Sequence, residues 1–101
     1  MKQPAFCTLT PDEFRAQRER YLRVRPTVER VERGAGEARI AFAPGFDPRL
    51  VRELVETEQR CCPFFTIDVD EEARLVRIAS DDPDRWDVID GFAAVFSRRA
   101  A

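Results

Sequence analysis

The sequence predicts a single α+β domain over residues 1–101, in which helices cover one face of an antiparallel sheet. A chain of 101 residues with 44% hydrophobic residues is long enough for one core and too short for two domains. Three Thr-Pro or Asp-Pro pairs each place a capping oxygen before a proline, which is typical of a helix start. Between these pairs, apolar residues recur at every second position, as they do in strands.

The first helix is expected over Pro11–Leu22 and begins after the capping residue Thr10. Glu13 stands three residues after Thr10, so the two side chains can form a capping box. The residues expected to face the core are Phe14, Tyr21 and Leu22.

The second helix is expected over Pro48–Cys61 and begins after Asp47. Its end is set by Pro63, because a proline disfavours helical geometry at the residue before it, here Cys62. The residues expected to face the core are Leu50, Val51, Leu54 and Val55.

The third helix is expected over Pro83–Arg98 and begins after Asp82. Gly91 inside it costs roughly 1 kcal/mol relative to alanine, and close approach of a neighbouring strand would explain its presence. The apolar stripe expected to face the core is Trp86, Ile89, Phe92, Ala93 and Phe96.

Four strands in two hairpins are expected between the helices, which makes the element order α-β-β-α-β-β-α. Turns are expected at Gly34-Ala35-Gly36 and at Asp70-Glu71-Glu72. A short additional leading strand over Ala5–Leu9 is a further expectation. The four strands are Thr27–Arg33 and the segments marked by Ala38, Ile40 and Phe42, by Phe65, Ile67 and Val69, and by Val76 and Ile78.

The spacing of the prolines is compatible with an internal duplication, which the sequence alone leaves open. Pro11 and Pro48 each begin a helix, and Pro26 and Pro63 each precede a hairpin at the same distance from that helix start. Helices on one face of the sheet leave the other face free. That free face is expected to carry Phe64, Thr66 and Asp68 and to be open or covered by another subunit.

Composition excludes several classes of function. The chain has no histidine, which removes Ser/His and Cys/His catalytic pairs and the HExxH metal site. A net charge of −2 does not favour binding to nucleic acid. No apolar run is long enough to span a membrane, and no export signal is evident, so a cytoplasmic protein with reduced thiols is expected.

The strongest chemical signal is the pair Cys61-Cys62 at the end of the second helix, with Glu58 one turn earlier on the same side. Neighbouring cysteines are poor disulfide partners, because their Cα atoms lie only ~3.8 Å apart across a trans peptide. Two thiolates can instead converge on one soft ion such as Hg(II), As(III) or Cu(I). Cys7 is a candidate third ligand, and Glu58 is a fourth ligand or a neighbour of the ligands. Zn(II) more often takes four ligands, and three sulfurs completed by a carboxylate such as Glu58 would be a less common set for it.

A purely structural role is the competing interpretation of the cysteine pair. Unpaired cysteines are often buried and pack as small apolar residues, and both cysteines continue the apolar stripe of the second helix. The C-terminal end of a helix also disfavours a thiolate, although Arg60 could offset this. A bound metal ion would supply the missing positive charge. If the duplication holds, Val24 and Arg25 occupy the matching positions, so only one half carries thiols.

The pattern of Cys7-Thr8-Leu9 followed by Glu58-x-x-Cys61-Cys62-Pro63-Phe64 resembles a family of small bacterial proteins without an established activity. Similar segments also occur attached to metal-responsive regulators of the mercury-resistance (MerR) type. The resemblance implies a link to thiophilic metal handling and a metal-responsive regulator as partner. The chain contains no helix-turn-helix, so it would be an accessory or sensing part.

The sequence leaves three functions open. The leading hypothesis is a small domain that binds or senses a soft metal or metalloid through its cysteine pair. The second is a thiol oxidoreductase or transferase in which Glu58 acts as the base, although the usual Cys-x-x-Cys spacing is absent. The third is a non-catalytic interaction module that forms a homodimer through a sheet edge or the free sheet face.

Overall fold

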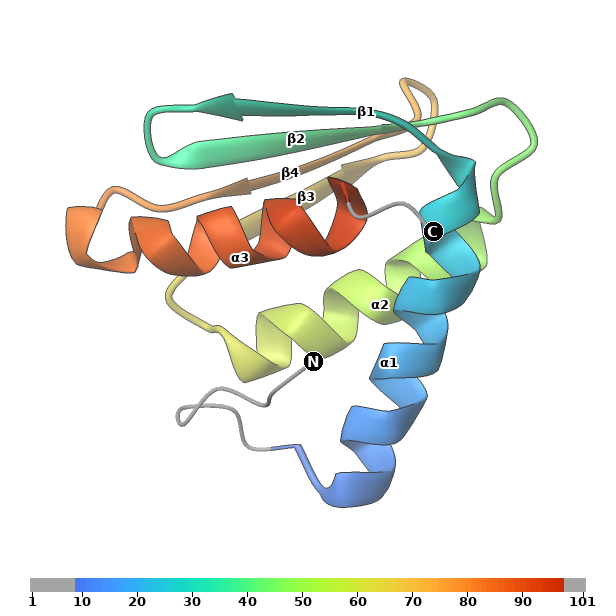
Figure 1. The fold of residues 1–101 in the computed structure, drawn as a ribbon, viewed down its shortest axis with the longest axis horizontal. Coiled ribbons are helices and arrows are strands. Elements are labelled where there is room, and N and C mark those ends of the chain that lie inside the picture. Colours follow the sequence, from blue (N-terminus) through green and yellow to red (C-terminus); the bar gives the residue numbers. More distant parts are fainter. Residues whose placement is uncertain (1–8, 98–101) are drawn as a thin grey trace.

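The computed structural model describes residues 9–97, in which the helices lie on one face of a four-stranded antiparallel sheet (Figure 1). The strand order in the sheet is β1-β2-β4-β3. The predicted two-layer α+β fold and its element order are therefore confirmed. The elements are α1 (Pro11–Val24), β1 (Val28–Gly34), β2 (Glu37–Phe42), α2 (Pro48–Cys61), β3 (Thr66–Asp70), β4 (Leu75–Ala79) and α3 (Trp86–Ser97), with short 3₁₀ turns at Arg25–Thr27 and Pro83–Arg85.

The helix starts follow from local capping, as the sequence predicts. Thr10 Oγ1 accepts a hydrogen bond from the Glu13 amide, and Glu13 Oε1 accepts one from the Thr10 amide, both at 3.1 Å. Asp47 accepts from the first amides of α2 in the same way. Asp82 caps the 3₁₀ turn that precedes α3. These caps satisfy amides that the helices themselves leave unpaired.

The predicted leading strand falls mostly on residues that the structure does not describe. Leu9, its last residue, is described; it is buried and does not belong to a strand. The described part of the sheet consists of the four predicted strands alone.

One prediction about the core residues of α1 is wrong, and one core residue was not predicted. Leu22 is 46% exposed, whereas Gln17 is only 1% exposed. The buried residues Gln17, Tyr21 and Val24 follow a spacing of four and three, which defines one helical stripe. Leu22 lies next to Tyr21 in sequence and therefore about 100° away from that stripe. Phe14 is half-buried at the margin of the stripe.

The third helix differs from its prediction at its start and in the role of its glycine. A 3₁₀ turn occupies Pro83–Arg85, so the α-helix begins at Trp86. Gly91 is exposed, and a Cβ atom placed on it would meet nothing within 4 Å. The expected close approach of a strand is therefore wrong, because Gly91 lies on the solvent side of α3.

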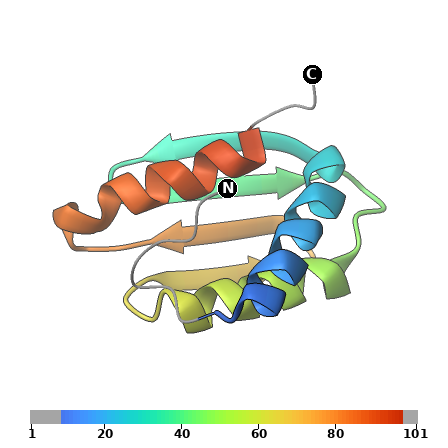
Figure 2. The same ribbon diagram turned by 60° about the horizontal axis from the view of Figure 1, so that its bottom comes forward.

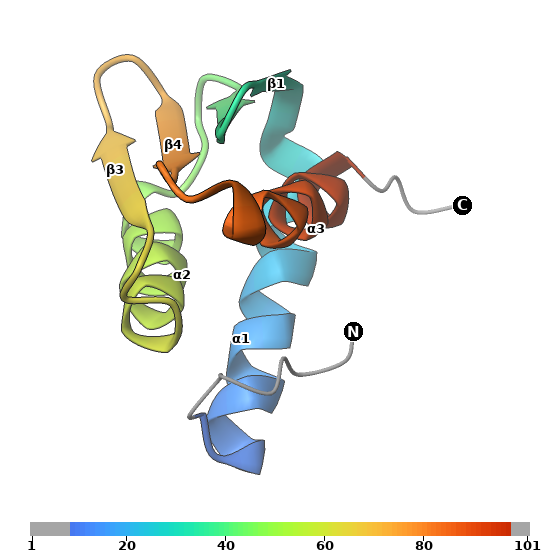
Figure 3. The ribbon, with the colours of Figure 1, turned by 90° about the vertical axis from the view of Figure 1, so that its left-hand side faces the viewer.

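An aromatic cluster joins the two layers where the end of α1 meets α3. The ring centroid of Phe96 lies 5.2 Å from that of Tyr21, 5.0 Å from that of Phe92 and 6.4 Å from that of Phe42. Edge-to-face geometry dominates these contacts, which is favourable for aromatic rings. Figure 2 shows α3 lying along β1 and β2, whereas α2 lies along β3, and Figure 3 shows the same arrangement from the side.

The free face of the sheet is polar. Arg77 pairs with Glu37 at 2.7 Å and with Asp68 at 3.9 Å, and Arg39 pairs with Glu37 at 3.3 Å. Phe64 was expected on this face, but it precedes β3, and its ring packs against that of Phe65. The charged ladder explains how this face remains stable in contact with water.

The fold contains two αββ units followed by α3, and their helices differ in their contacts with the sheet: α2 lies along β3, whereas α3 takes the equivalent place on β1 and β2. Helices α1 and α2 both begin with proline and are both 14 residues long. They contact each other through equivalent positions, since Gln17 binds Leu54 and Tyr21 binds Glu58, both 37 residues apart. The strand order is unchanged when β1 and β2 are exchanged for β3 and β4. These correspondences are compatible with the internal duplication, which stays a prediction.

The hairpin turn between β1 and β2 allows a stability prediction. Gly36 has a φ of +69°, and a Cβ atom there would lie 2.7 Å from the Ser80 carbonyl oxygen. We expect Gly36→Ala to lower the free energy of unfolding by about 2–3 kcal/mol, because left-handed strain and a backbone clash add. Urea denaturation measures this change. Gly45→Ala is the control, since Gly45 has a φ of +89° but an open surrounding. Equal losses in the two variants would contradict the role given to the clash.

Candidate functional site

The cysteine pair lies where α2 ends and the chain turns towards β3. Helix α2 ends at Cys61, as predicted from Pro63, and Cys62 adopts a non-helical conformation with φ −126° and ψ 69°. The Cys62 amide still donates to the Glu58 carbonyl at 2.7 Å. The Phe65 amide in turn donates to the Cys62 carbonyl at 3.2 Å. Backbone hydrogen bonds therefore hold the pair in a defined turn.

The side chain of Gln59 fastens this turn to the edge of the sheet. Its amide nitrogen donates to the carbonyl oxygens of Cys62 at 3.2 Å and Phe65 at 2.7 Å. Its amide oxygen accepts from the Ile67 amide at 3.2 Å. Sequence reasoning missed this residue, because a glutamine in a helix carries no signal of contacts to the next strand.

The two cysteines are equally buried but differ in oxidation state. Each is 5% exposed. Cys62 is a free thiol, whereas Cys61 is disulfide-bonded. The expectation that both thiols are reduced is therefore wrong for Cys61. Because Cys62 is free, Cys61 is not bonded to its neighbour, which agrees with the unfavourable geometry of a bond between adjacent residues. Cys7, the third predicted ligand, lies outside the described residues.

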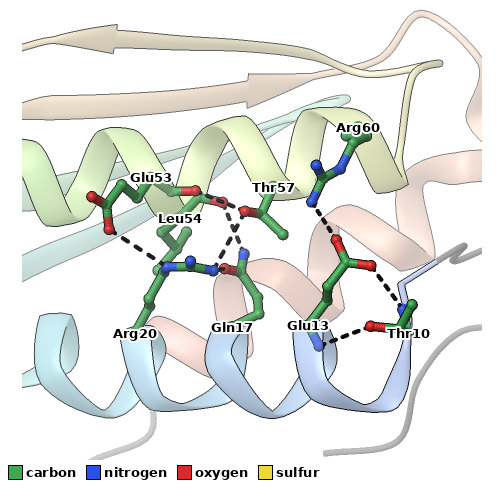
Figure 4. A network of polar contacts seen from close by, with 8 residues as sticks. All are labelled: Thr10, Glu13, Gln17, Arg20, Glu53, Leu54, Thr57 and Arg60. Atoms are coloured by element: carbon green, nitrogen blue, oxygen red, sulfur yellow. Dashed lines mark hydrogen bonds and ion pairs between the residues drawn. The ribbon is translucent and has the colours of Figure 1, made fainter.

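The carboxylate of Glu58 is held by two neutral donors from α1. Its Oε1 atom accepts from the Tyr21 hydroxyl at 2.7 Å and from the Gln17 side-chain amide at 3.1 Å. The same Gln17 nitrogen also donates to the Leu54 carbonyl at 2.8 Å, and Figure 4 shows it lying between the two helices. Glu58 itself is half-buried. The predicted position of Glu58 on the side of the cysteines is supported, since its charge acts on Cys62.

The arginines of α1 and α2 near this site pair with other carboxylates (Figure 4). Arg60 binds Glu13 at 3.0 Å, and Arg20 lies 3.8 Å from Glu53. The expectation that Arg60 offsets the helix dipole at the thiols is not met, because Arg60 pairs with Glu13 of α1 instead. Arg85 is the positive group that acts on Cys62, and its guanidinium lies 4.2 Å from the ring centroid of Phe64. Sequence reasoning did not find Arg85, because it lies far from Cys62 in the chain.

Burial and charge keep the hydroxyl and the thiol of this site protonated. Burial raises the pKa of Cys62 to about 12, and the negative charge of Glu58 acts in the same direction while Arg85 opposes it. Burial also raises the pKa of Tyr21 well above its ordinary value, and the charge of Glu58 and its hydrogen bond contribute further. A low-dielectric setting penalises a second negative charge beside the first. The site therefore holds a neutral thiol beside a carboxylate.

The described residues do not contain a preformed group of metal-binding side chains. Within residues 9–97, no three Cys, His, Asp or Glu side chains form a group able to hold a metal ion. The predicted ligands Cys61, Cys62 and Glu58 are therefore neighbours that do not yet surround one point. No helix among these residues has the length and apolar character needed to cross a bilayer.

Fold and site together define a class: a small α+β protein with a buried cysteine pair next to a carboxylate. No known protein family, curated protein sequence or solved structure matches the chain. The resemblance to small bacterial proteins with a Glu-x-x-Cys-Cys-Pro-Phe segment therefore stays a prediction.

Proposed function

We propose that the chain binds one thiophilic metal or metalloid ion through the sulfur atoms of Cys61 and Cys62 once the disulfide at Cys61 is reduced. One observation carries this proposal: two consecutive buried cysteines stand at the end of the helix that carries Glu58, the charge of Glu58 acts on Cys62, and the hydrogen-bond donors of Glu58, Tyr21 and Gln17, are both neutral. A cation at this place meets soft ligands and a negative charge that these donors do not neutralise. Thiolates favour Hg(II), Cu(I) and As(III), with Zn(II) a less suitable guest.

The raised pKa of Cys62 is compatible with binding of a cation. A ligating thiol is deprotonated, because the positive charge of the ion replaces that of the proton. The pKa of about 12 therefore means that the empty site stays neutral at sulfur and that binding releases a proton. The apparent affinity should consequently fall as the pH is lowered.

Each residue has a distinct part in this proposal. Cys61 and Cys62 bind the ion, and Glu58 balances its charge or completes its coordination. Tyr21 and Gln17 hold the Glu58 carboxylate in place. Cys7 would supply a third sulfur. Such a site suits a metal sensor in a reducing compartment such as the cytoplasm, acting with a metal-responsive regulator.

A thiol oxidoreductase is the second candidate, and the disulfide at Cys61 beside the free thiol of Cys62 favours it. Such an enzyme needs a thiolate as nucleophile. The raised pKa of Cys62 weighs against that role, because the thiol is almost fully protonated at neutral pH. Metal binding therefore ranks first.

Native mass spectrometry of the full chain tests the proposal. The chain is reduced, freed of reductant without oxygen, and mixed with Hg(II) or Cu(I) in the presence of a competing chelator. We expect the reduced wild type to retain one ion and the Cys61→Ser/Cys62→Ser variant to retain none, because the soft ligands are gone. Equal uptake by the two would refute the proposal.

Two controls separate ligand loss from other effects. Cys7→Ser leaves the neighbouring pair intact, so it should still bind an ion, more weakly if Cys7 is the third ligand. The oxidised wild type should bind less than the reduced chain, because Cys61 is then blocked. Circular dichroism confirms that each variant is folded. Rapid alkylation of Cys62 with a pKa below ~7 would instead favour the oxidoreductase.

A further inference from the structure

The two edge strands of the sheet, β3 and β1, differ in whether another element covers their outer backbone groups. At β3, the side chain of Gln59 accepts from the Ile67 amide and donates to the Phe65 carbonyl, so α2 occupies this edge. At the other edge, β1 has β2 as its only strand neighbour within residues 9–97. Figure 2 shows β1 along the rim of the sheet opposite to β3 and α2. A strand edge of this kind is a template for a further strand.

Hydrogen-bond directions show which groups of β1 face outward. The Phe42 amide donates to the Arg74 carbonyl, on the side of β2 away from β1. Backbone groups alternate in direction along a strand, so those of Ala41 point towards β1. Its register partner Arg30 therefore bonds to β2. Val31, the next residue along β1, directs its amide and carbonyl away from the sheet.

The charges of β1 are arranged so that the strand complements itself. Arg30 and Glu32 flank Val31 and pair with each other at 2.5 Å along the strand, and their side chains are 62% and 55% exposed, so each can also meet a charge on a neighbouring strand. An antiparallel copy centred on Val31 places each Arg30 opposite Glu32 of the other copy and the two Val31 residues opposite each other. A shift of two residues would instead place Arg30 against Arg30 or Glu32 against Glu32. Opposite charges across strands stabilise a pair, and like charges destabilise it.

We propose that two copies of this chain pair through β1 in an antiparallel fashion, about a two-fold axis at Val31, and form a continuous eight-stranded sheet. The strand that pairs with this edge is β1 of a second copy, because an antiparallel copy of β1 places Arg30 and Glu32 opposite each other. The outward amide and carbonyl of each Val31 bond to those of the other. The irregularity in register between Val28 and Arg30 ends the regular pairing, so the interface is short and the dimer dissociates on dilution.

Sedimentation velocity of the full chain under reducing conditions tests this proposal from ~10 μM to ~1 mM, the range of a weak complex. Reductant excludes dimers linked through cysteine. We expect concentration-dependent dimers for the wild type. Arg30→Glu and Glu32→Arg should each weaken dimerisation at least ~10-fold, because each places like charges opposite each other. A wild type that stays monomeric throughout would overturn the proposal.

A mixing experiment separates the interface from effects on the fold. In a mixed dimer of the two single variants, position 30 of each copy faces position 32 of the other. The two acidic residues of the R30E copy therefore face the two basic residues of the E32R copy in both halves of the interface. The mixture should therefore dimerise as tightly as the wild type, and so should the double variant R30E/E32R. Failure of both to restore dimers, with folded chains by circular dichroism, would overturn the pairing.

Discussion

Cys62 is expected to react with iodoacetamide at pH 8 at least about 50-fold more slowly in the folded chain than in urea. Its pKa rises from 9.0 to about 12 on folding, so the thiolate fraction falls about a thousandfold. The more basic thiolate is intrinsically more nucleophilic, which recovers roughly 20-fold. Burial at 5% exposure slows the reaction further. Peptide mapping by mass spectrometry follows alkylation at this residue.

The contribution of Glu58 to this protection can be isolated. Glu58→Gln removes the second-largest cause of the raised pKa while keeping the side-chain shape, so Cys62 should react several-fold faster than in the wild type. Glu56→Gln is the matched control, because Glu56 is an exposed residue of the same helix. Equal rates for folded and unfolded wild type would show that Cys62 is not held as a buried neutral thiol.

The second prediction concerns alkaline pH. Between pH 9 and pH 12 the unfolded chain releases the Cys62 proton and the folded chain retains it, so the free energy of unfolding falls as the pH rises. From pH 8 to pH 11 the expected loss from Cys62 is about 3 kcal/mol. Tyr21 acts with the same sign from its ordinary value upward, because its pKa is also raised. Urea denaturation at a series of pH values measures the loss.

The loss of stability at alkaline pH can be assigned to individual residues, because the chain has one tyrosine and no histidine. Cys62→Ala should remove the decline that begins near pH 9, and Tyr21→Phe should remove the part that begins higher. Both variants should keep the wild-type response below pH 8, where neither group titrates in either state. A wild-type stability that does not change up to pH 11 would contradict the protonation states described for the site.

These protonation states also bear on the proposed metal site. A cysteine held as a neutral thiol is protected from electrophiles that attack thiolates, yet it remains available to an ion that can displace a proton. Glu58 serves both properties, because its charge opposes the thiolate and attracts the cation. Such a site would discriminate between soft metal ions and organic electrophiles.

Much of the fold was predictable because its signals are local. The capping residues before Pro11 and Pro48 and the proline after Cys62 act within a few residues, and both helices have the predicted starts. The alternation around Ile40 likewise identified β2, whose buried residues point to the helices. The extent of α3 was overestimated by one turn, because the same proline signal also starts a 3₁₀ turn.

What the sequence by itself determined is the set of helices and strands and the position of the cysteine pair at a helix end, since capping, proline geometry and apolar period depend on near neighbours. Only the tertiary structure decided that Gln17 is buried, that Tyr21 binds Glu58 and that Arg85 acts on Cys62. These relations join residues far apart in the chain. Their energies depend on how α1, α2 and the segment before α3 pack, which no local pattern specifies.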